Sequence, residues 1–175
     1  MLLSFLVLAC ENSSPVNQLS QQTSETKTLR FFWGGDLTPL WHPAGFQTFS
    51  QACIFYLIFN NLVQLDKDLE TILPDLAESW EISSDARVFT FQLRQDVKWH
   101  DGTPFTAKDV IFSFSRQVLE PYRYIKYMHH VEGAADYREG GADYVRGLEQ
   151  VDNFTVRITL DNPNTLFLLY LSEPT

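Results

Sequence analysis

The residues of this chain best suited to binding a metal ion are its four histidines, and their spacing argues against such a site. His129 and His130 are adjacent, so on a helix their side chains would point about 100° apart. No two histidines stand four residues apart, and His42 and His100 are single. Because a zinc site needs several ligands that converge on one point, we predict no metal site and no bound cofactor.

Three aspartates are the candidate acids and bases, and each has a structural duty that explains it. Asp85 and Asp101 lie at predicted turns, and Asp109 lies in the first turn of a predicted helix. The chain contains no nucleophile elbow, no phosphate-binding loop and no HExxH motif. The sequence therefore favours a protein that catalyses no reaction.

Two segments predict β-strands that are buried on one face only. Residues 89–94 alternate apolar and polar side chains, and Val97 and Trp99 continue the same parity. Residues 154–160 alternate in the same way, and residues 161–164 break that pattern with Asn and Pro. Alternation with a period of two is typical of a sheet with one face in water, so we expect both segments in such a sheet.

A turn and a capped helix follow the first of these strands. Asp101 and Gly102 predict the turn. Thr106 and Asp109 stand three residues apart, so hydroxyl and carboxylate can each satisfy a backbone amide of the other, as in a capping box. The helix that follows carries one apolar stripe, formed by Val110, Ile111, Phe114 and Val118.

The region before these elements predicts a strand, a helix and a hairpin. Residues 28–33 are rich in strand formers and end at two glycines. Residues 46–62 are strongly apolar, with aromatic side chains at several helical offsets, which indicates a helix buried on most of its circumference. Residues 62–65 with the turn at 66–68 predict the start of a hairpin.

Composition describes an acidic globular protein. The chain has 175 residues, of which 45% are hydrophobic, with a net charge of −9 and a pI near 4.8. Binding to nucleic acid requires a basic surface, and the 13 Lys and Arg residues are scattered. We therefore exclude nucleic acid as a partner.

The first residues resemble a secretion signal that ends at a lipid attachment site. Residues 2–9 form an apolar run too short to span a bilayer, and residues 7–10 resemble a bacterial lipobox in which Cys10 becomes lipidated. No Lys or Arg precedes Lys27, although a secretion signal normally begins with basic residues. We therefore interpret residues 1–9 as the remnant of a longer signal. The alternative is that Cys10 is an incidental cysteine.

Residues 10–27 predict a disordered tether between such an anchor and a folded body. They are rich in Ser, Gln, Asn and Thr and lack apolar periodicity, so they cannot bury enough surface to offset the entropy of ordering. The only other cysteine, Cys53, lies in an apolar run, and we expect a buried, unreactive thiol there.

Taken together, these motifs resemble the family 5 extracellular solute-binding proteins, which deliver peptides, nickel and related solutes to ABC importers. The compound pattern is far more specific than any single tripeptide. Its residues are Leu73, Pro74, Leu76–Trp80, Asp85, Phe91, Leu93, Arg94, Val97, Trp99, Asp101–Pro104, Ala107, Asp109 and Val110, followed by Gly147–Asp152, Phe154, Val156, Ile158, Leu160 and Pro163. Most of these positions suit core, turn or cap, so the pattern identifies a fold.

The resemblance implies a mixed α/β (α+β) fold of the periplasmic-binding-protein type, cluster C. Residues 28–61 would begin the first lobe, and residues 62–175 would form most of the extra domain called domain II. Family members are considerably longer, with a second lobe that closes over the solute. We therefore interpret the chain as a truncated form that lacks the second lobe, and we expect it to bind peptides negligibly by itself.

The resemblance also implies which residues face the solute. In peptide-binding relatives the stretch after the position of Pro43 lines the cleft, and an aromatic residue of domain II reaches the ligand. The implied ligand-binding residues here are Gln47, Thr48, Phe49, Tyr56 and Tyr122. For Phe49, Tyr56 and Tyr122, packing in the core is an open alternative.

The function implied is that of a monomeric solute receptor outside the cytoplasmic membrane, anchored to a membrane by a lipid at Cys10. Its partners would be a peptide or similar small solute, the importer's membrane subunits and an ATPase on the inner face. Two alternatives remain open: a sensor that uses the same fold without transport, and a gene remnant without function.

Overall fold

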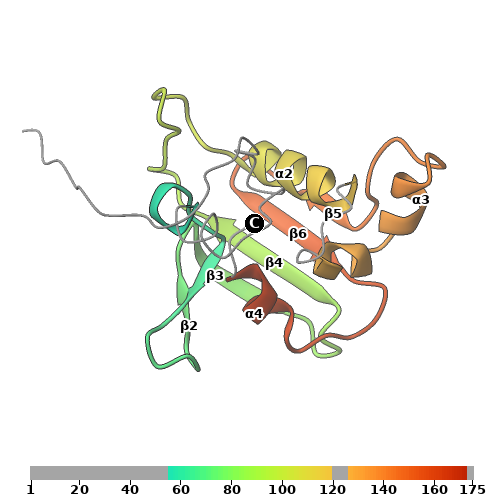
Figure 1. The fold of residues 1–175 in the computed structure, drawn as a ribbon, viewed down its shortest axis with the longest axis horizontal. Helices are drawn as coiled ribbons and strands as arrows, with labels where there is room; N and C mark the ends of the chain where they lie inside the picture. Colours follow the sequence, from blue (N-terminus) through green and yellow to red (C-terminus); the bar gives the residue numbers. More distant parts are fainter. Residues whose placement is uncertain (1–54, 120–125, 173–175) are drawn as a thin grey trace, which may run out of the picture. The chain divides into compact units, whose positions relative to one another are not determined.

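Two antiparallel sheets form the framework of the computed structural model, which describes residues 55–119 and 126–172. A two-stranded ribbon pairs β1 (Val63–Leu65) with β2 (Ile72–Pro74). A four-stranded sheet has the strand order β3-β4-β6-β5 (Figure 1). Its strands are β3 (Ala77–Ile82), β4 (Val88–Leu93), β5 (Leu148–Gln150) and β6 (Thr155–Thr159).

Helices fill the connections between the strands. The long helix α2 (Ala107–Leu119) follows β4, and the short helices α3 (Ala134–Arg138) and α4 (Phe167–Leu171) flank β5 and β6 in sequence. A 3-10 helix spans Lys126–His130. Within the described residues, no helix combines the length and apolar character that crossing a membrane requires.

The alternation seen in the sequence places one apolar face on the four-stranded sheet, as predicted. Phe89 and Phe91 on β4 stand opposite Ile158 and Val156 on β6, and all four are buried. The intervening residues, such as Gln92, point to the other, more polar face. Antiparallel sheets commonly keep one face in water, and this sheet does so.

Val97 and Trp99 differ from the prediction that they continue β4. The strand ends at Leu93, and Arg94 turns to form an ion pair with Asp96, with 2.9 Å between Nη2 and Oδ2. Val97 packs at the margin of the core, whereas Trp99 is 39% exposed. Parity is informative only while the chain stays extended, and here the chain bends.

The helices cover the apolar face of the sheet. The buried residues of α2 include Val110, Phe114 and Val118, which confirms most of the predicted stripe, and Ile111 packs at its edge. Figure 1 shows α2 over β5 and β6, which it contacts. On α4, the ring of Phe167 packs against that of Phe89 on β4 at 5.0 Å between centroids.

The cap of α2 forms only half of the predicted box. The Asp109 carboxylate accepts from the Thr106 amide at 2.8 Å, as expected. The Thr106 hydroxyl donates to the same carboxylate at 2.9 Å, so it does not act as the acceptor that a full box requires. A short Asp side chain stays close enough to capture both donors of Thr106, which explains the difference.

The predicted turns are present, and two of them hold non-glycine residues in the left-handed region. Asp101 accepts from the Thr103 amide at 2.9 Å, and Gly102 has φ of 88°. In the β1–β2 hairpin Leu69 has φ of 60°, and in the β3–β4 turn Ala86 has φ of 52°. Residues with a Cβ atom reach this region at a cost in free energy.

Gly147 marks a close approach between backbones in front of β5. A Cβ atom there would lie 2.8 Å from the Glu132 nitrogen and nearer still to the Thr159 carbonyl oxygen. The Gly147 amide donates to Glu132 at 2.7 Å, and its carbonyl accepts from the Thr159 amide at 2.8 Å. Only glycine fits between these two segments.

The predicted helix over 46–62 ends earlier in the chain, and is more exposed at its end, than expected. Residues 55–58 are helical, and the chain leaves the helix before Phe59. Phe55 is buried, but Tyr56, Leu57 and Ile58 are exposed, so the prediction of burial on most sides is wrong for this part. The predicted tether, the strand at 28–33 and Cys53 lie outside the described residues.

Candidate functional site

Most residues expected to face the solute lie outside the described part of the chain. These are Gln47, Thr48, Phe49 and Tyr122, and the same holds for Cys10. Tyr56 is described, lies in the helical residues 55–58 and is 50% exposed. Burial in a core therefore does not account for Tyr56.

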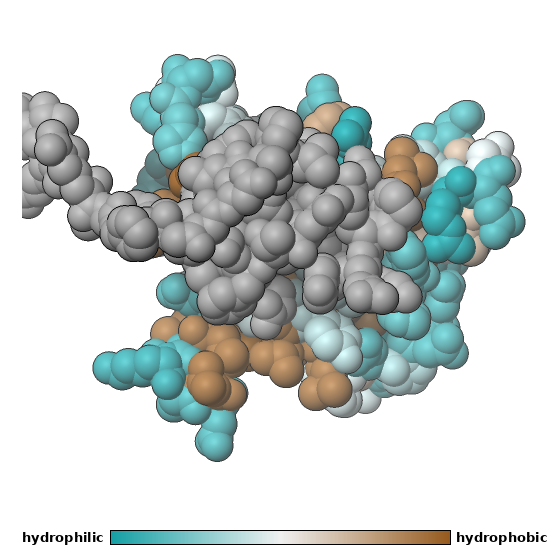
Figure 2. Space-filling view, in the orientation of Figure 1, coloured by the Kyte–Doolittle hydropathy of each residue, from teal (hydrophilic) through white to brown (hydrophobic). Residues whose placement is uncertain are grey.

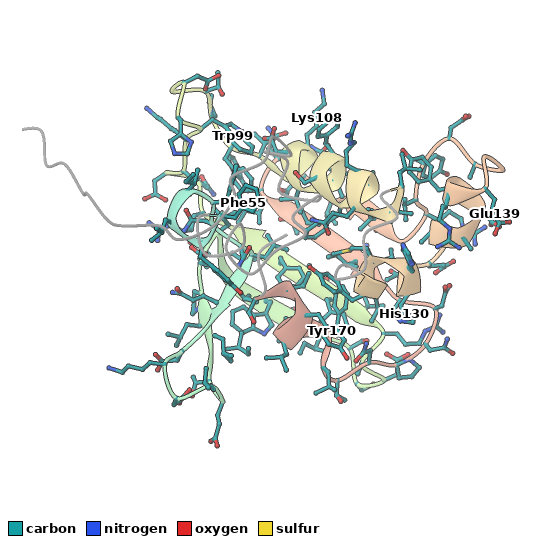
Figure 3. The ribbon with its side chains drawn as sticks, in the orientation of Figure 1. Phe55, Trp99, Lys108, His130, Glu139 and Tyr170 are labelled. Carbon is teal, nitrogen blue, oxygen red and sulfur yellow. The ribbon has the colours of Figure 1, made fainter. Side chains whose placement is uncertain are left out.

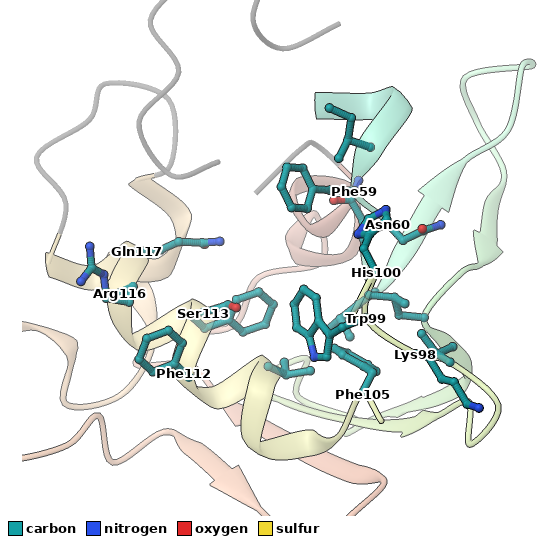
Figure 4. Close-up of a pocket in the computed structure, with 17 residues that line it drawn as sticks. Phe59, Asn60, Lys98, Trp99, His100, Phe105, Phe112, Ser113, Arg116 and Gln117 are labelled. Atoms are coloured by element: carbon teal, nitrogen blue, oxygen red, sulfur yellow. The ribbon is translucent and has the colours of Figure 1, made fainter. Parts of the chain in front are cut away.

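A pocket of about 220 Å³ opens beside the sheet, between residues 58–62, residues 97–105 and one side of α2 (Figure 4). We call it the aromatic pocket. Five aromatic residues line it: Phe59, Trp99, Phe105, Phe112 and Phe114. Its polar lining residues are Asn60, Asn61, Lys98, His100, Ser113, Arg116 and Gln117.

The wall made by residues 58–62 is held in place by two asparagines. The buried Asn61 side chain donates from Nδ2 to the Ser172 carbonyl oxygen at 3.0 Å, which ties this wall to the end of α4. Its backbone amide and the Asn60 side chain both donate to the carboxylate of Asp75, at 3.0 Å and 2.7 Å. These bonds fix the backbone while leaving Phe59 at the surface.

The wall made by residues 97–105 is a short loop closed on itself. The Trp99 amide donates to the Thr103 carbonyl oxygen at 2.8 Å, and the Phe105 amide donates to that of Val97 at 3.1 Å. The rings of Trp99 and Phe105 meet edge to face, with centroids 5.9 Å apart. Phe105 is buried, so it anchors the exposed indole of Trp99 against the core.

The third wall is α2, which presents two contrasting residues. Phe112 is 67% exposed, although its neighbours Val110 and Phe114 are buried. Gln117 is only 2% exposed, and its Oε1 atom has no hydrogen-bond partner. Buried polar atoms are nearly always paired, so this oxygen is an unusual feature of the pocket.

The charged side chains among the described lining residues of the pocket are all basic. Lys98 and Arg116 line it together with His100, and none of the described lining residues is acidic. This contrasts with a chain whose net charge is −9. In the loop of residues 97–105, hydrogen bonds from the Thr103 hydroxyl and amide lower the pKa of the Asp101 carboxyl group, which therefore stays ionised at neutral pH.

The described lining residues of the pocket could contact a bound molecule, and none of them is an Asp, a Glu or a Cys. Within the described residues, no three His, Cys, Asp or Glu side chains are grouped to hold a metal ion. His130 lies well apart from Trp99, the neighbour of His100 (Figure 3). Charged side chains such as Lys108 and Glu139 point outward rather than converging on one site (Figure 3).

Sequence reasoning did not find this pocket. The wall made by residues 58–62 lies 35 positions before the wall made by residues 97–105 in the sequence, so no single local motif marks the pocket. The available signal was Trp99, which stands between the basic residues Lys98 and His100 in a polar, turn-forming stretch.

Figure 2 shows further apolar side chains at the surface, in the area that α4 occupies in Figure 1, where Leu166 and Leu169 are exposed.

Comparison with protein families gives one clear match. A model described as bacterial extracellular solute-binding proteins, family 5 (middle), matches residues 71–175. This range includes the four-stranded sheet, α2 and the loop that carries Trp99.

Individual relatives agree with the family match. The chain is 36% identical to the dipeptide-binding protein of Escherichia coli over 126 residues, 66% of this chain and 22% of the relative. It is 33% identical to heme-binding protein A of Haemophilus influenzae over 186 residues, 96% of this chain and 32% of the relative. The chain thus spans between about a fifth and a third of the length of these relatives.

Solved structures share the fold. Haemophilus influenzae OppA in complex with RPPGFSPFR matches with a TM-score of 0.68 and 30% identity, over 75% of this chain and 26% of that chain. The Escherichia coli murein tripeptide binding protein MppA matches with the same TM-score and 31% identity, over 75% of this chain and 26% of that chain. The predicted mixed fold of the periplasmic-binding-protein type is confirmed.

Proposed function

This chain belongs to the family 5 bacterial extracellular solute-binding proteins, and we propose that it is part of a peptide receptor for an ABC importer. The observation that carries the proposal is the structural match to OppA in complex with RPPGFSPFR, at a TM-score of 0.68 and 30% identity. The relative from Escherichia coli that binds dipeptides supports the same solute class. Such a receptor binds and releases its solute unchanged, so the proposal requires no catalytic residue.

We further propose that residues 28–61 begin the first lobe and that residues 62–175 form most of domain II. The continuous core supports this division, because Leu62, Val63 and the four-stranded sheet belong to one buried cluster with α2. In this arrangement Gln47, Thr48, Phe49 and Tyr56 would face the solute, together with Tyr122. The half-exposed ring of Tyr56 suits that role, since tyrosine covers apolar surface and offers a hydroxyl for polar groups.

Peptide uptake in the native cell tests this proposal. A strain that lacks the gene should take up labelled dipeptides and tripeptides more slowly than its parent, and the intact gene should restore the rate. Tyr56→Ala should restore it only in part, whereas Lys108→Ala, at an exposed position on α2, should restore it fully. Unchanged uptake in the deletion strain would reject the peptide receptor.

Heme is a second candidate solute, favoured by one observation. The alignment with heme-binding protein A covers 96% of this chain, whereas that with the dipeptide-binding protein covers 66%. The same strains, grown with heme as the only iron source, separate the two solutes. Slower growth of the deletion strain on heme, with peptide uptake unchanged, would assign the chain to heme instead.

We propose a location outside the cytoplasmic membrane, with a lipid anchor at Cys10 and the importer's membrane subunits as partners. The lipobox-like residues 7–10 and the polar stretch that follows them support the anchor. Labelled palmitate should enter the wild-type chain but not Cys10→Ser, and the variant should leave the membrane fraction. Equal labelling of both chains would reject the anchor, and light scattering would test the monomeric state.

A further inference from the structure

We propose that Asn61 and Asp75 are positioning residues of the peptide site, because together they fix the part of the chain that carries Tyr56. Tyr56 faces the solute in the proposed function, so the inference rests on that function. It deepens the function by adding two residues that touch no peptide themselves and act on binding through Tyr56.

A hydrogen bond in the core fixes the place of residue 61. The Asn61 side chain donates from Nδ2 to the Ser172 carbonyl oxygen at 3.0 Å, and the two residues lie 111 positions apart in the chain. A buried polar group is costly unless it is hydrogen-bonded, so a displaced residue 61 would leave this donor and acceptor unpaired. Both belong to the small set of buried polar residues in the described ranges, which are Asn61, Gln117, Thr155 and Ser172.

The backbone of Asn61 and the side chain of Asn60 are held as well. The Asn61 amide donates to Oδ2 of Asp75 at 3.0 Å, and its carbonyl oxygen accepts from the Leu76 amide at 3.0 Å. The Asn60 side chain donates to Oδ1 of Asp75 at 2.7 Å. Residues 60 and 61 are therefore bonded to two places, the turn between β2 and β3 and the end of α4.

The core holds both of these attachment points. Ser172 directly follows α4, whose Phe167 is fully buried and packs its ring 5.0 Å from that of Phe89. The carbonyl oxygen of Leu76 accepts from the Arg94 amide at 2.9 Å, which ties the turn between β2 and β3 to the end of β4. Side chains in well-packed cores move little, so the two points form a rigid base.

The helical residues 55–58, which carry Tyr56, stand directly on this base. The Phe59 amide closes their last turn by donating to the Phe55 carbonyl oxygen at 2.8 Å, and Figure 4 shows Phe59 where the chain leaves the helix. Phe55 is buried, whereas the three residues after it are exposed. Tyr56 lies five positions before Asn61, so a displacement of residue 61 would pass through one short turn to the Tyr56 ring.

Peptide uptake by complemented strains that lack the chromosomal gene tests this inference. Asn61→Ala removes the donor to Ser172, and Asp75→Asn keeps the shape of the side chain but replaces one of its two acceptor oxygens with a donor. Each should raise the peptide concentration that gives half-maximal uptake by about two- to tenfold, the size expected for residues coupled in one network. Immunoblots should show equal amounts of receptor in all strains.

Thr155→Ala is the matched control. It removes the hydroxyl of another buried polar residue, which lies 3.0 Å from Oε1 of Gln92 and 2.8 Å from Oδ2 of Asp152. Thr155 stands on β6, outside the segment of residues 55–61. The half-maximal concentration should therefore stay unchanged. An increase equal to that of Asn61→Ala would show that any weakening of the core has this effect, and it would overturn the inference.

Combination with Tyr56→Ala separates positioning from a general loss of stability. In the Tyr56→Ala background, Asn61→Ala should raise the half-maximal concentration no further, because the side chain through which it acts is gone. Additive effects of the two substitutions would overturn the inference, as would an unchanged half-maximal concentration in Asn61→Ala or in Tyr56→Ala. Unchanged uptake in the strain without the gene is a different result, because it rejects the peptide receptor itself.

Discussion

The apolar face of the four-stranded sheet and the aromatic pocket use the same kinds of side chain in opposite ways. Phe91 on β4 is fully buried, whereas Phe112 on α2 is 67% exposed. In the sheet, cross-strand partners and the helices above them cover each ring. In the pocket, residues 58–62 and 97–105 hold their backbones by hydrogen bonds and leave the rings partly open.

This difference separates residues that hold the fold from residues available for recognition. Every apolar ring on the sheet face contributes to stability by leaving water. The open rings of the pocket remove less surface from water on folding, so they gain less from it. Substitutions on the two sides should therefore affect stability very differently.

The largest contrast should be between Phe91→Ala and Phe112→Ala. Removing the buried ring of Phe91 leaves a cavity, so the free energy of unfolding should fall by about 3–5 kcal/mol. Removing the exposed ring of Phe112 should change it by less than about 0.5 kcal/mol. Urea denaturation followed by circular dichroism measures both, and a similar loss in the two variants would abolish the distinction between the regions.

Asn61→Ala tests whether the backbone of the pocket wall is tied into the core. The substitution removes the donor to the Ser172 carbonyl oxygen in a buried setting. The free energy of unfolding should fall by about 1–3 kcal/mol. The control is Asn60→Ala, whose side chain bonds to Asp75 at an exposed site, and its effect should be under about 0.5 kcal/mol. If Asn61→Ala lowers the free energy of unfolding no more than Asn60→Ala does, the hydrogen bond to Ser172 does not anchor the wall.

Glycine at two strained turn positions, one next to the pocket wall and one in the four-stranded sheet, should raise the free energy of unfolding. Leu69 lies in the β1–β2 hairpin, which leads from the pocket wall, and Ala86 lies in the turn of the main sheet. Relief of the left-handed strain, about 1–2 kcal/mol, outweighs the entropic cost of glycine, about 0.5–1 kcal/mol. Leu69→Gly and Ala86→Gly should each raise the free energy of unfolding by about 0.5–1 kcal/mol in urea, by the difference of those terms. A loss of stability in either would contradict the strain.

The smallest effect should come from acid titration of the turn aspartates. Hydrogen bonds lower the pKa of Asp85 and Asp152 beside the sheet, and of Asp101 in the pocket loop. A lowered pKa means that the folded protein binds fewer protons, so this stability is complete above the unfolded pKa of about 3.9 and is lost as the pH falls through the lower, folded value.

Urea midpoints at neutral pH and below pH 4 measure this dependence. Asp85→Asn and Asp101→Asn should each make the acid-induced decrease smaller, because the substituted amide does not titrate. An unchanged decrease in both variants would show that these carboxylates do not contribute to it. If both substitutions reduce the acid-induced decrease equally, the turn of the sheet and the loop of the pocket have the same dependence on pH.

Local patterns predicted the sheet side well. The alternation over 89–94 and 154–160 placed Phe91 and Val156 on one face because side-chain direction in a strand depends only on parity. The stripe on α2 and the turns at Asp85 and Asp101 follow from equally local rules. These rules fail where another group takes the hydrogen bond. In a capping box the Thr106 hydroxyl accepts from a backbone amide, but here it donates to the Asp109 carboxylate.

The candidate site was beyond local patterns. Trp99 reads as the continuation of a strand, yet the bend after Leu93 turns it outward. The Oε1 atom of Gln117 has no hydrogen-bond partner, and no sequence pattern encodes a missing hydrogen bond. The solute-facing residues expected from the family, such as Phe49 and Tyr122, lie outside the described residues and remain predictions.

The family, the mixed fold and the apolar faces of the strands follow from residue spacing along the chain, so they can be predicted without coordinates. The meeting of Trp99, Phe112 and Gln117 around one pocket with a basic lining becomes visible when the chain is folded. Exposure, charge environment and hydrogen-bond satisfaction each depend on all the neighbours of a residue in space. Here residues 58–62 join residues 97–105 and α2, and only the folded chain brings these segments together.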